Sequence, residues 1–511
     1  MFVLMYPRVG VVWALFVLRK NGCDGLNWLS RLFCKFTPAP RSLSLDNLII
    51  LSRKKERQME YSIPRVVIAG TNSGCGKTTV TCAVLQALVN RRLKVGAFKC
   101  GPDYIDPMFH SKIIGAKSAN LDLFFFGENT LKYLLAKNGA DRDISVIEGV
   151  SGYYDGMGLT STRGSTYDIA AVTQSPVVLV LDASGAALSV LANLLGYLTF
   201  CPDSQIRGVI INQCSAGFYQ VLAEEIRKRF AGKVRPLGFM PSLDECRLES
   251  RHLGLVTAEE VQNLREKLQI LASQAEQSID MEGLIELAGS AWPIACDAVN
   301  LPRFEERVRV AVARDRAFCF YYEDSLEALA EMGAELVPFS PISDRELPHG
   351  IHGLYLGGGY PELYAKELSE NKTMLASVRG ALEGGLPCIS ECGGFMYLTG
   401  YIGDYPMVGF LPGRSFDTGK LARFGYITLK AKEDTMLCRA GEEIPAHEFH
   451  HWDSEQAGDS FTATTAYGSS WECAFATEHL YAGYPHFHFY ANTEFAVNFY
   501  KACLKEKRRR G

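Results

Sequence analysis

The chain has 511 residues, which is too long for one ordinary domain and suits two or three. Apolar residues make up 47% and charged residues 22%, the balance of a globular protein with large cores. The net charge of −4 gives no reason to expect a nucleic-acid partner. The 15 cysteines are scattered and form no CxxC pair, so we expect free thiols in a reducing, cytoplasmic setting.

Residues 1–58 differ from the rest of the chain. Met1–Leu18 is apolar, but it contains Pro7 and Arg8 and is short for a membrane span. It also lacks the positive region that precedes the apolar core of a signal peptide. We therefore expect the functional protein to begin near Met59, with residues 1–58 a start-site artefact or disordered. The alternative is a membrane-associating N-terminus; stable membrane association is not expected.

The next part of the chain predicts a parallel α/β sheet, because short β-branched runs alternate with longer helical patterns. The expected strands are Arg65–Ala69, Lys94–Phe98, Ile144–Glu148, Pro176–Leu181 and Gly208–Ile211. Helices are expected between them, including Lys77–Val89 and Leu188–Leu198. A helical stretch rich in Glu, Gln and Leu follows, from about Ala258 to Leu287.

A second α/β pattern begins at Val308–Ala313. Its strands continue at Glu335–Phe339, Gly353–Leu356 and Pro387–Ser390, and a strand-rich region runs from about Met407 to Phe489. The predicted fold class is α/β with two domains. We expect a nucleotide-binding domain over 63–257, a helical connector over 258–306, a second domain over 307–502 and a basic tail over 503–511.

A phosphate-binding loop follows the first strand and leads into a helix, with the sequence Gly70-Thr-Asn-Ser-Gly-Cys-Gly-Lys-Thr-Thr79. Glycines let backbone N–H groups turn inward, the helix N-terminus adds positive potential, and Lys77 reaches the outer phosphates. Gly70 lies one residue earlier than the usual pattern, and Thr71 holds its place. We predict ATP contacts from Thr71, Asn72, Gly74, Gly76, Lys77, Thr78 and Thr79, and from Asn212 after a later strand.

Acidic residues after two other strands complete a predicted Mg²⁺ site. Asp103 lies in the Gly-Pro-Asp-Tyr-Ile-Asp-Pro segment after the second strand, and Glu148 ends the third. Both are expected at the carboxyl edge of the sheet, where α/β proteins bind ligands. Mg²⁺ beside phosphates takes one or two carboxylates plus waters. Thr78, Asp103 and Glu148 are the predicted ligands, and Asp106 and Asp155 are weaker candidates.

The second half carries a candidate cysteine nucleophile. In Pro387-Cys-Ile-Ser-Glu-Cys-Gly-Gly-Phe-Met396, a strand turns sharply into a helix with Cys392 at the apex, which is the geometry of a nucleophile elbow. The glycine loop Leu356–Glu362 follows another strand, so Gly358 and Gly393 are expected to form an oxyanion hole. A base is available from His486 or His488.

One motif points elsewhere. His447-Glu-Phe-His-His451 matches HExxH, which on a helix places two histidines on one face for zinc. Pro445 lies just before it and Trp452-Asp453 follow, within a strand-and-turn region. A zinc protease is therefore disfavoured.

From Arg65 to about Tyr500 the chain resembles the cobyrinic acid a,c-diamide synthase family. The segments that carry the resemblance are Gly70–Thr79, Phe98–His110, Glu148–Gly156, Leu248–Leu255, Ala313–Phe318, Leu356–Glu362, Glu391–Leu398 and His447–His450. Two departures concern substrate identity: Ser151-Gly-Tyr-Tyr replaces the Met-Gly-Leu-Phe of many relatives, and His451 replaces a tyrosine.

The resemblance implies a dethiobiotin-synthetase-like P-loop domain followed by a class I-type glutamine amidotransferase that lacks the third triad acid. It implies Cys392 as nucleophile and His486 as its base, with ATP and Mg²⁺ activating carboxylates a and c of cobyrinic acid for amidation by ammonia. A closed domain interface or channel is then expected between the sites. The sequence leaves the oligomeric state open and is compatible with a homodimer.

Other functions remain open on sequence alone. The same chemistry suits Ni-sirohydrochlorin or hydrogenobyrinic acid as the acceptor. A different class of protein, a P-loop regulatory ATPase with a degenerate amidotransferase half, is disfavoured because Cys392 and His486 are both present.

Overall fold

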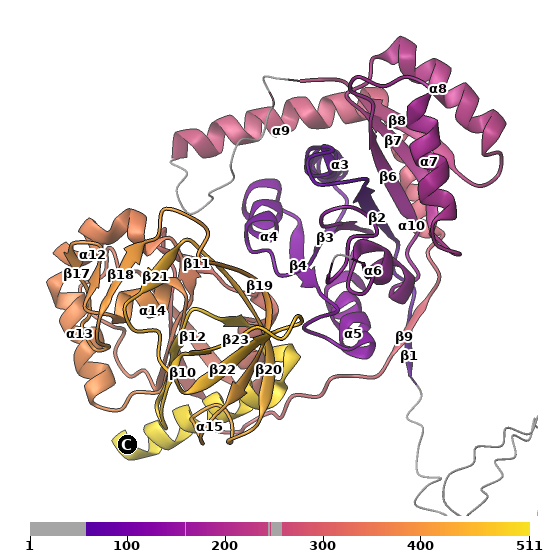
Figure 1. The fold of residues 1–511 in the computed structure, drawn as a ribbon. Coiled ribbons are helices and arrows are strands. Elements are labelled where there is room, and N and C mark those ends of the chain that lie inside the picture. The colour runs from indigo at the N-terminus through magenta and orange to yellow at the C-terminus, as the bar shows by residue number, and fades with distance from the viewer. Residues whose placement is uncertain (1–57, 159, 244–245, 247–257) are drawn as a thin grey trace, which may run out of the picture. The chain divides into compact units, whose positions relative to one another are not determined.

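The computed structural model describes residues 58–158, 160–243, 246 and 258–511 (Figure 1). The expectations for the N-terminal extension, and the family segment Leu248–Leu255, lie outside the described residues. Gln58–Gly511 forms one compact unit.

A seven-stranded parallel sheet forms the core of the nucleotide half. Its strands in spatial order are β4 (Lys117–Leu121), β3 (Val95–Cys100), β5 (Ile144–Glu148), β2 (Arg65–Gly70), β6 (Val177–Asp182), β7 (Ile206–Asn212) and β8 (Arg235–Met240). The five predicted strands are confirmed to within two residues at each end, whereas β4 and β8 were not predicted. The strands are apolar along most of their length because helices cover both faces (Figure 1).

Helices connect these strands and extend beyond them. They are α3 (Lys77–Asn90), α4 (Ile105–Phe109), η1 (His110–Ile114), α5 (Glu128–Gly139), α6 (Thr166–Val172), α7 (Ser189–Thr199), α8 (Ala216–Arg229), α9 (Ala258–Ser278) and α10 (Met281–Gly289). The predicted helical stretch after the first domain is thus two helices, with Asp280 capping the second through Gly283 N–H. Leu268 and Leu284 of this stretch share a buried core with α3, so these helices pack onto the nucleotide sheet.

A six-stranded sheet forms the core of the second half. Its spatial order is β12 (Ala334–Phe339), β10 (Val308–Ala313), β13 (Gly353–Leu356), β15 (Cys388–Glu391), β25 (Leu480–Gly483) and β24 (Phe475–Ala476). The first five strands are parallel and β24 is antiparallel. The helices of this half are α11 (Glu323–Met332), η3 (Pro361–Tyr364), α12 (Ala365–Glu370), α13 (Lys372–Glu383), α14 (Gly393–Leu398), η4 (Phe489–Ala491) and α15 (Thr493–Arg510).

The predicted strand-rich region forms a second, antiparallel sheet. Its order is β23 (Ser470–Cys473), β22 (Phe461–Thr465), β19 (Arg423–Ala431), β20 (Glu443–His450) and β26 (His486–Phe487). Shorter strands are β1 (Met59–Tyr61) with β9 (Ile294–Cys296), β11 (Phe318–Phe320) with β14 (Gly358–Gly359), and the group β16 (Tyr401–Ile402), β17 (Tyr405–Pro406), β18 (Arg414–Asp417) and β21 (Trp452–Ser454).

The basic C-terminal run is helical. Lys505–Arg510 forms the last turns of α15 and not a separate tail. Glu506 accepts hydrogen bonds from Arg509 and Arg510 within the helix. Cations at a helix C-terminus are favoured by the helix dipole, which suits this position.

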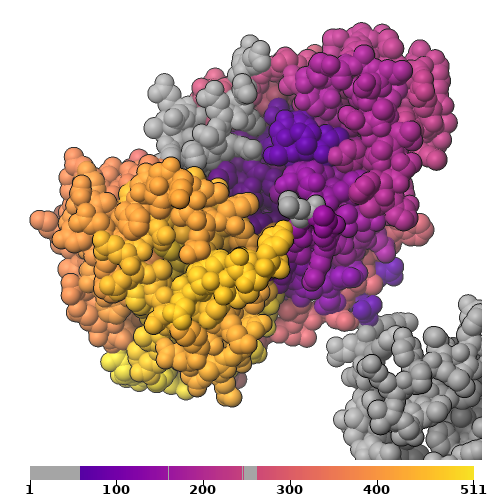
Figure 2. Space-filling model, in the orientation of Figure 1, coloured from indigo at the N-terminus to yellow at the C-terminus, as the bar shows by residue number. Residues whose placement is uncertain are grey.

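Polar contacts join the two halves. The Tyr426 hydroxyl on β19 donates to Asp122 Oδ2 at 2.6 Å, and Asn138 Nδ2 on α5 donates to Asp324 Oδ1 at 2.9 Å. The β22–β23 hairpin also extends to the nucleotide half beside Gly158 (Figure 2).

Arg65 is fully buried at the start of β2 and is held by main-chain acceptors. Its guanidinium donates to the carbonyls of Ile63 (2.9 Å), Thr173 and Trp292 (2.6 Å), and to the Ser175 hydroxyl (3.0 Å). One side chain therefore donates hydrogen bonds to acceptors in three separate segments of the chain.

Replacing Arg65 with leucine should destabilise the protein, because the buried carbonyls of Ile63 and Thr173 lose their donor. Buried groups left without a partner cost about 1–3 kcal/mol each, so we expect a loss of at least about 2 kcal/mol. Urea denaturation followed by fluorescence would measure it. The half-exposed Arg207→Leu is the matched control and should change stability by less than about 0.5 kcal/mol; equal effects of the two substitutions would contradict the assignment.

Candidate active site

The phosphate loop lies between β2 and α3, at the carboxyl edge of the sheet. Gly74 and Gly76 adopt φ angles of 85° and 86°, which glycine tolerates and other residues rarely do. Asn212 Nδ2 donates to the Cys75 carbonyl at 3.0 Å, and a Cβ on Gly76 would meet that amide at 2.0 Å. Asn212 therefore braces the loop, and its contact with ATP remains a prediction. The predicted contacts from Thr71, Asn72 and Thr79 remain predictions as well.

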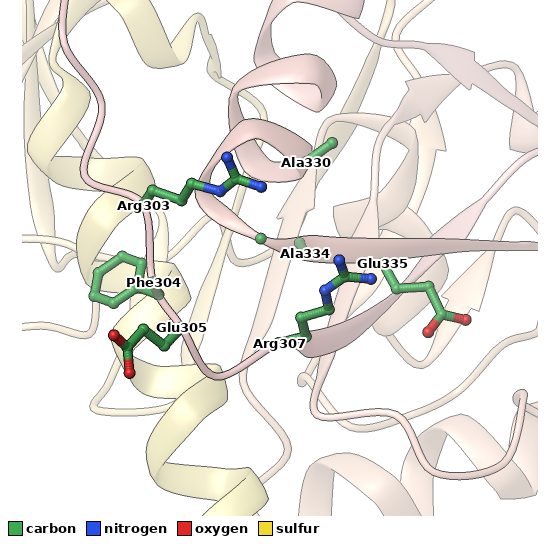
Figure 3. A pocket seen from close by; sticks show the side chains of 8 residues that line it. Arg303, Phe304, Glu305, Arg307, Ala330, Ala334 and Glu335 are labelled. Atoms are coloured by element: carbon green, nitrogen blue, oxygen red, sulfur yellow. The ribbon is translucent and has the colours of Figure 1, made fainter.

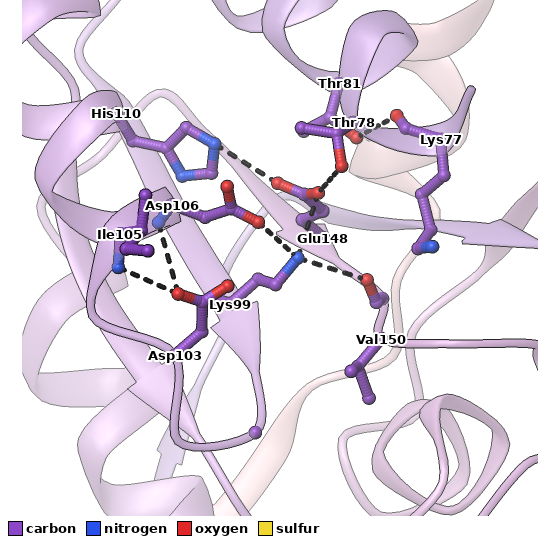
Figure 4. A network of polar contacts seen from close by, with 12 residues as sticks. Lys77, Thr78, Thr81, Lys99, Asp103, Ile105, Asp106, His110, Glu148 and Val150 are labelled. Atoms are coloured by element: carbon purple, nitrogen blue, oxygen red, sulfur yellow. Dashed lines mark hydrogen bonds and ion pairs between the residues drawn. The ribbon is translucent and has the colours of Figure 1, made fainter. Parts of the chain in front are cut away.

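The central strands β3 and β5 place Lys99 and Glu148 beside this loop, and Lys77 begins the helix that follows it (Figure 4). Thr78 Oγ1 donates to Glu148 Oε1 at 2.7 Å, and Lys99 Nζ lies 2.9 Å from the same oxygen. Burial opposes ionisation of Glu148, but Lys99 and His110 outweigh it and hold its pKa well below the usual range. Burial lowers the pKa of Lys77, and Lys99 nearby adds to the effect. A bound phosphate would stabilise the charged form of Lys77.

Asp103 and Asp106 differ in their surroundings. Asp106 Oδ2 forms an ion pair with Lys99 at 2.6 Å, so this weaker metal candidate has a cationic partner. Asp103 Oδ1 accepts the Ile105 N–H at 2.8 Å. Burial and then the Asp106 charge raise the pKa of Asp103 to about 6. Asp155, the other weaker candidate, accepts the Gly152 N–H and closes a turn.

The donor set suits a magnesium ion that also binds phosphates. Among the described residues, no group of three His, Cys, Asp or Glu side chains is arranged to hold a metal by itself. Glu148 Oε2 is buried, faces His110 Nε2 at 3.2 Å, and accepts no well-aligned hydrogen bond from the described residues. The Thr78 hydroxyl lies next to the Glu148 carboxylate, which has an unsatisfied oxygen, and this pair fits Mg²⁺. Beside phosphates, Mg²⁺ takes few protein ligands, and phosphate and water oxygens occupy its other coordination positions.

The second site forms where three neighbouring parallel strands end. β13 leads into the Gly357–Gly359 loop, β15 into Cys392, and β25 through a short turn into His486. Cys392 has φ 49° and ψ −105°, a strained conformation for a residue with a side chain. Its N–H donates to the Gly483 carbonyl at 2.7 Å. The nucleophile-elbow geometry predicted from the sequence is therefore present.

The glycine loop and the histidine close around this cysteine. A Cβ on Gly358 would lie 2.5 Å from His486 Cε1, and one on Gly393 would lie 3.1 Å from the Gly359 nitrogen. The backbone at Gly358 and Gly393 is thus close to the cysteine and histidine. The role of these two glycines in an oxyanion hole remains a prediction. Burial lowers the pKa of His486, but Cys392 and Glu391 outweigh it and raise it to about 10. A protonated His486 next to the Cys392 side chain fits this environment.

The structure separates the two candidate bases. His488 Nδ1 accepts the Tyr490 N–H at 3.2 Å, and its ring packs against Phe126 and Tyr322. Burial lowers the pKa of His488 to about 3, so it is a neutral part of an aromatic core. His486 is the base that the geometry favours.

The HExxH motif does not form a zinc site. Glu443–His450 is the strand β20 and not a helix, so His447 and Glu448 project to opposite faces. His451 lies beyond the strand and is exposed. His450 stacks on Tyr484 with ring centroids 4.0 Å apart.

Tyr104 connects the two centres. It follows Asp103 directly, and its ring packs on His486 with centroids 5.2 Å apart and on Tyr322 at 4.4 Å. A cavity of about 440 Å³ adjoins it and is lined from both halves, by residues that include Met108, Asn120, Phe318 and His488. A larger hollow of about 600 Å³ at Arg303, Phe304, Arg307 and Glu335 is lined by none of the site residues and takes no part here (Figure 3).

Three residues of these sites were not predicted: Lys99, His110 and Glu391. Lys99 and His110 lie within the acidic segment that marks the metal site, and Glu391 lies next to the cysteine. The sequence therefore places all three residues in or next to the motifs, but it does not indicate which side chains they contact.

Comparison with known proteins identifies both halves. Residues 66–256 match the CobQ/CobB/MinD/ParA nucleotide binding domain, and residues 309–494 match the CobB/CobQ-like glutamine amidotransferase domain. A cobyrinate a,c-diamide synthase of Caldanaerobacter subterraneus is 41% identical over 86% of this chain and 98% of its own. One from Thermoplasma volcanium is 40% identical over 88% of this chain and 99% of its own.

The chain belongs to the cobyrinate a,c-diamide synthase family. Its two halves are therefore a nucleotide-binding domain and a glutamine amidotransferase domain. Among solved structures, MinD of Aquifex aeolicus is 14% identical, covers 44% of this chain and 94% of its own, and has a TM-score of 0.27, too low to support an argument.

Replacing Lys77 with alanine should weaken ATP binding, because we predict that this lysine pairs with phosphate charge. A hydrogen bond to a charged group contributes about 1.5–3 kcal/mol, so we expect a loss of about 10- to 150-fold. Calorimetric titration with ATP and Mg²⁺ would measure it. The exposed Lys94→Ala is the control and should bind as wild type does; unchanged binding in Lys77→Ala would contradict the predicted role.

Proposed function

We propose that this chain is a carbon–nitrogen ligase that uses ATP and glutamine to amidate the a and c side-chain carboxylates of cobyrinic acid, a step of cobalamin biosynthesis. The observation that carries the proposal is the contact between Tyr104 and His486, which joins a nucleotide cradle to a cysteine–histidine pair. The names of relatives that match nearly the whole chain support the acceptor. A regulatory ATPase would need neither the strained Cys392 nor His486 beside it.

In the amidotransferase half, the Cys392 thiolate attacks the amide carbon of glutamine. The oxyanion is stabilised by backbone N–H groups near Gly358 and Gly393. His486 gives its proton to the leaving nitrogen, so ammonia departs and a γ-glutamyl thioester remains. Water then releases glutamate, with His486 acting as the base.

In the nucleotide half, Lys77 and the loop N–H groups hold ATP so that an acceptor carboxylate takes the γ-phosphoryl group. Thr78 and Glu148 would hold Mg²⁺, with Asp103 as the further ligand. When bound, that ion would neutralise phosphate charge, the main requirement of such a transfer. Ammonia then displaces phosphate from the acyl phosphate and leaves the amide.

We propose a short route for ammonia between the centres. Tyr104 lies between Asp103 and His486, and the cavity beside it is lined by residues of both halves. We propose that this cavity is part of the passage that the chemistry needs, because ammonia released into water would be protonated.

The setting that we propose is the cytoplasm. Every cysteine in the described residues is a free thiol, which suits a reducing compartment. None of the helices in the described parts of the chain has the length and apolar character to cross a membrane. A homodimer is the assembly that we would test first.

A product assay tests the proposal directly. The protein is incubated with cobyrinic acid, ATP, Mg²⁺ and glutamine, and products are followed by mass spectrometry. We expect two successive replacements of a carboxyl hydroxyl by an amino group. Cys392→Ala should lower the glutamine-dependent rate by at least about 10³-fold, because the nucleophile is lost, whereas added ammonia should restore it.

Each other outcome has a distinct meaning. If wild type hydrolyses glutamine but leaves cobyrinic acid unchanged, the acceptor is wrong, and Ni-sirohydrochlorin and hydrogenobyrinic acid are the next to test. If Cys392→Ala retains glutamine-dependent synthesis, the assigned nucleophile is wrong.

A further inference from the structure

Glu391 is a buried carboxylate directly before the nucleophile. It ends β15 and is 1% exposed, and its Oε2 lies 3.4 Å from His486 Nδ1. This distance is at the outer limit of a hydrogen bond, as is common for catalytic contacts before substrate binds.

No other described residue supplies a cation to this carboxylate. His486 is the one basic side chain of the described residues within 4 Å of it. Burial raises the pKa of Glu391, and the contact with His486 opposes that increase most strongly. Burying a carboxylate is costly unless it is paired, so the pairing with His486 accounts for its presence.

The contact also determines how the imidazole is oriented. With Nδ1 directed at Glu391, Nε2 is the nitrogen left to exchange a proton with Cys392. A carboxylate on one imidazole nitrogen fixes the tautomer and stabilises the imidazolium, as in serine-protease triads. The residue two positions beyond His486 is His488, which packs in an aromatic core and has no carboxylate to offer His486.

We propose that Glu391 is the third member of the glutaminase triad, supplied by the strand that carries the nucleophile. It acts as a positioning residue: it orients His486 and stabilises its charge while the thiolate forms. The inference rests on the glutaminase half of the proposed function and does not depend on which macrocycle is amidated.

The test is Glu391→Gln, which keeps the size of the side chain and removes its charge. We expect kcat for glutamine hydrolysis to fall about 10²-fold, at the lower end of general acid–base contributions, while KM for glutamine stays close to wild type. Ammonia-dependent synthesis should be unchanged. Glu506→Gln removes another buried carboxylate of the same half, one paired with Arg509 and Arg510, and should hydrolyse glutamine as wild type does.

A second readout separates orientation from mere packing. The rate of Cys392 alkylation by iodoacetamide is measured against pH, and in Glu391→Gln its midpoint should move to higher pH. The reason is that a less basic His486 takes the thiol proton less readily. The other titratable groups nearby are the same in both proteins. They are Tyr104, which precedes α4, and His447 of β20, which face His486, and Tyr355 of β13, which faces Glu391.

Several results would overturn the inference. An unchanged kcat, or a lowered kcat with an unchanged alkylation midpoint, would make Glu391 a packing residue only. If Glu391→Gln fails to fold, Glu391→Asp should move the midpoint in the same direction by less, and no movement would refute the role. Because alkylation requires no turnover, it distinguishes this failure from failure of the proposed function, in which wild type itself would not hydrolyse glutamine.

Discussion

The architecture depends on one buried ion-paired segment that serves both active centres. At the end of β3, Lys99 pairs with Glu148 and Asp106, and this neutralises carboxylates that the fold has removed from water. The same segment then turns, and Tyr104 packs against His486 of the other half. The position of the nucleotide site therefore constrains the position of the glutaminase base, because the segment from Lys99 to Tyr104 contacts both sites.

Both centres use the same property of parallel sheets. Loops leave neighbouring strands at one edge, so residues far apart in sequence converge there. In the nucleotide half, β3, β5 and β2 bring together Asp103, Glu148 and Lys77. In the amidotransferase half, β13, β15 and β25 bring together the glycine loop, Cys392 and His486. Glycine is needed where the backbone must turn, as at Gly76, and Cys392 tolerates strain because the surrounding strands fix it.

The sequence predicted the parts whose signal is local. The P-loop, the elbow at Cys392 and five strands of the nucleotide sheet follow from short patterns of glycine and β-branched residues. Two pairings were not predicted because their residues are far apart in the sequence. Lys99 and Glu148 are 49 positions apart, and Glu391 and His486 are 95 positions apart. The choice of His486 over His488 also needed the structure, since only the fold shows which ring is enclosed by aromatic side chains.

The claim that the two centres work as one enzyme is tested most directly by the source of the product nitrogen. Glutamine carrying heavy nitrogen in its amide is supplied together with an excess of unlabelled ammonium, and the amidated product is analysed by mass spectrometry. Direct transfer between the two centres predicts that the product keeps the heavy label at ammonium concentrations that exceed the ammonia released from glutamine but are too low to support synthesis by Cys392→Ala. Label that falls in proportion to the added ammonium would show release into solvent and would contradict the account.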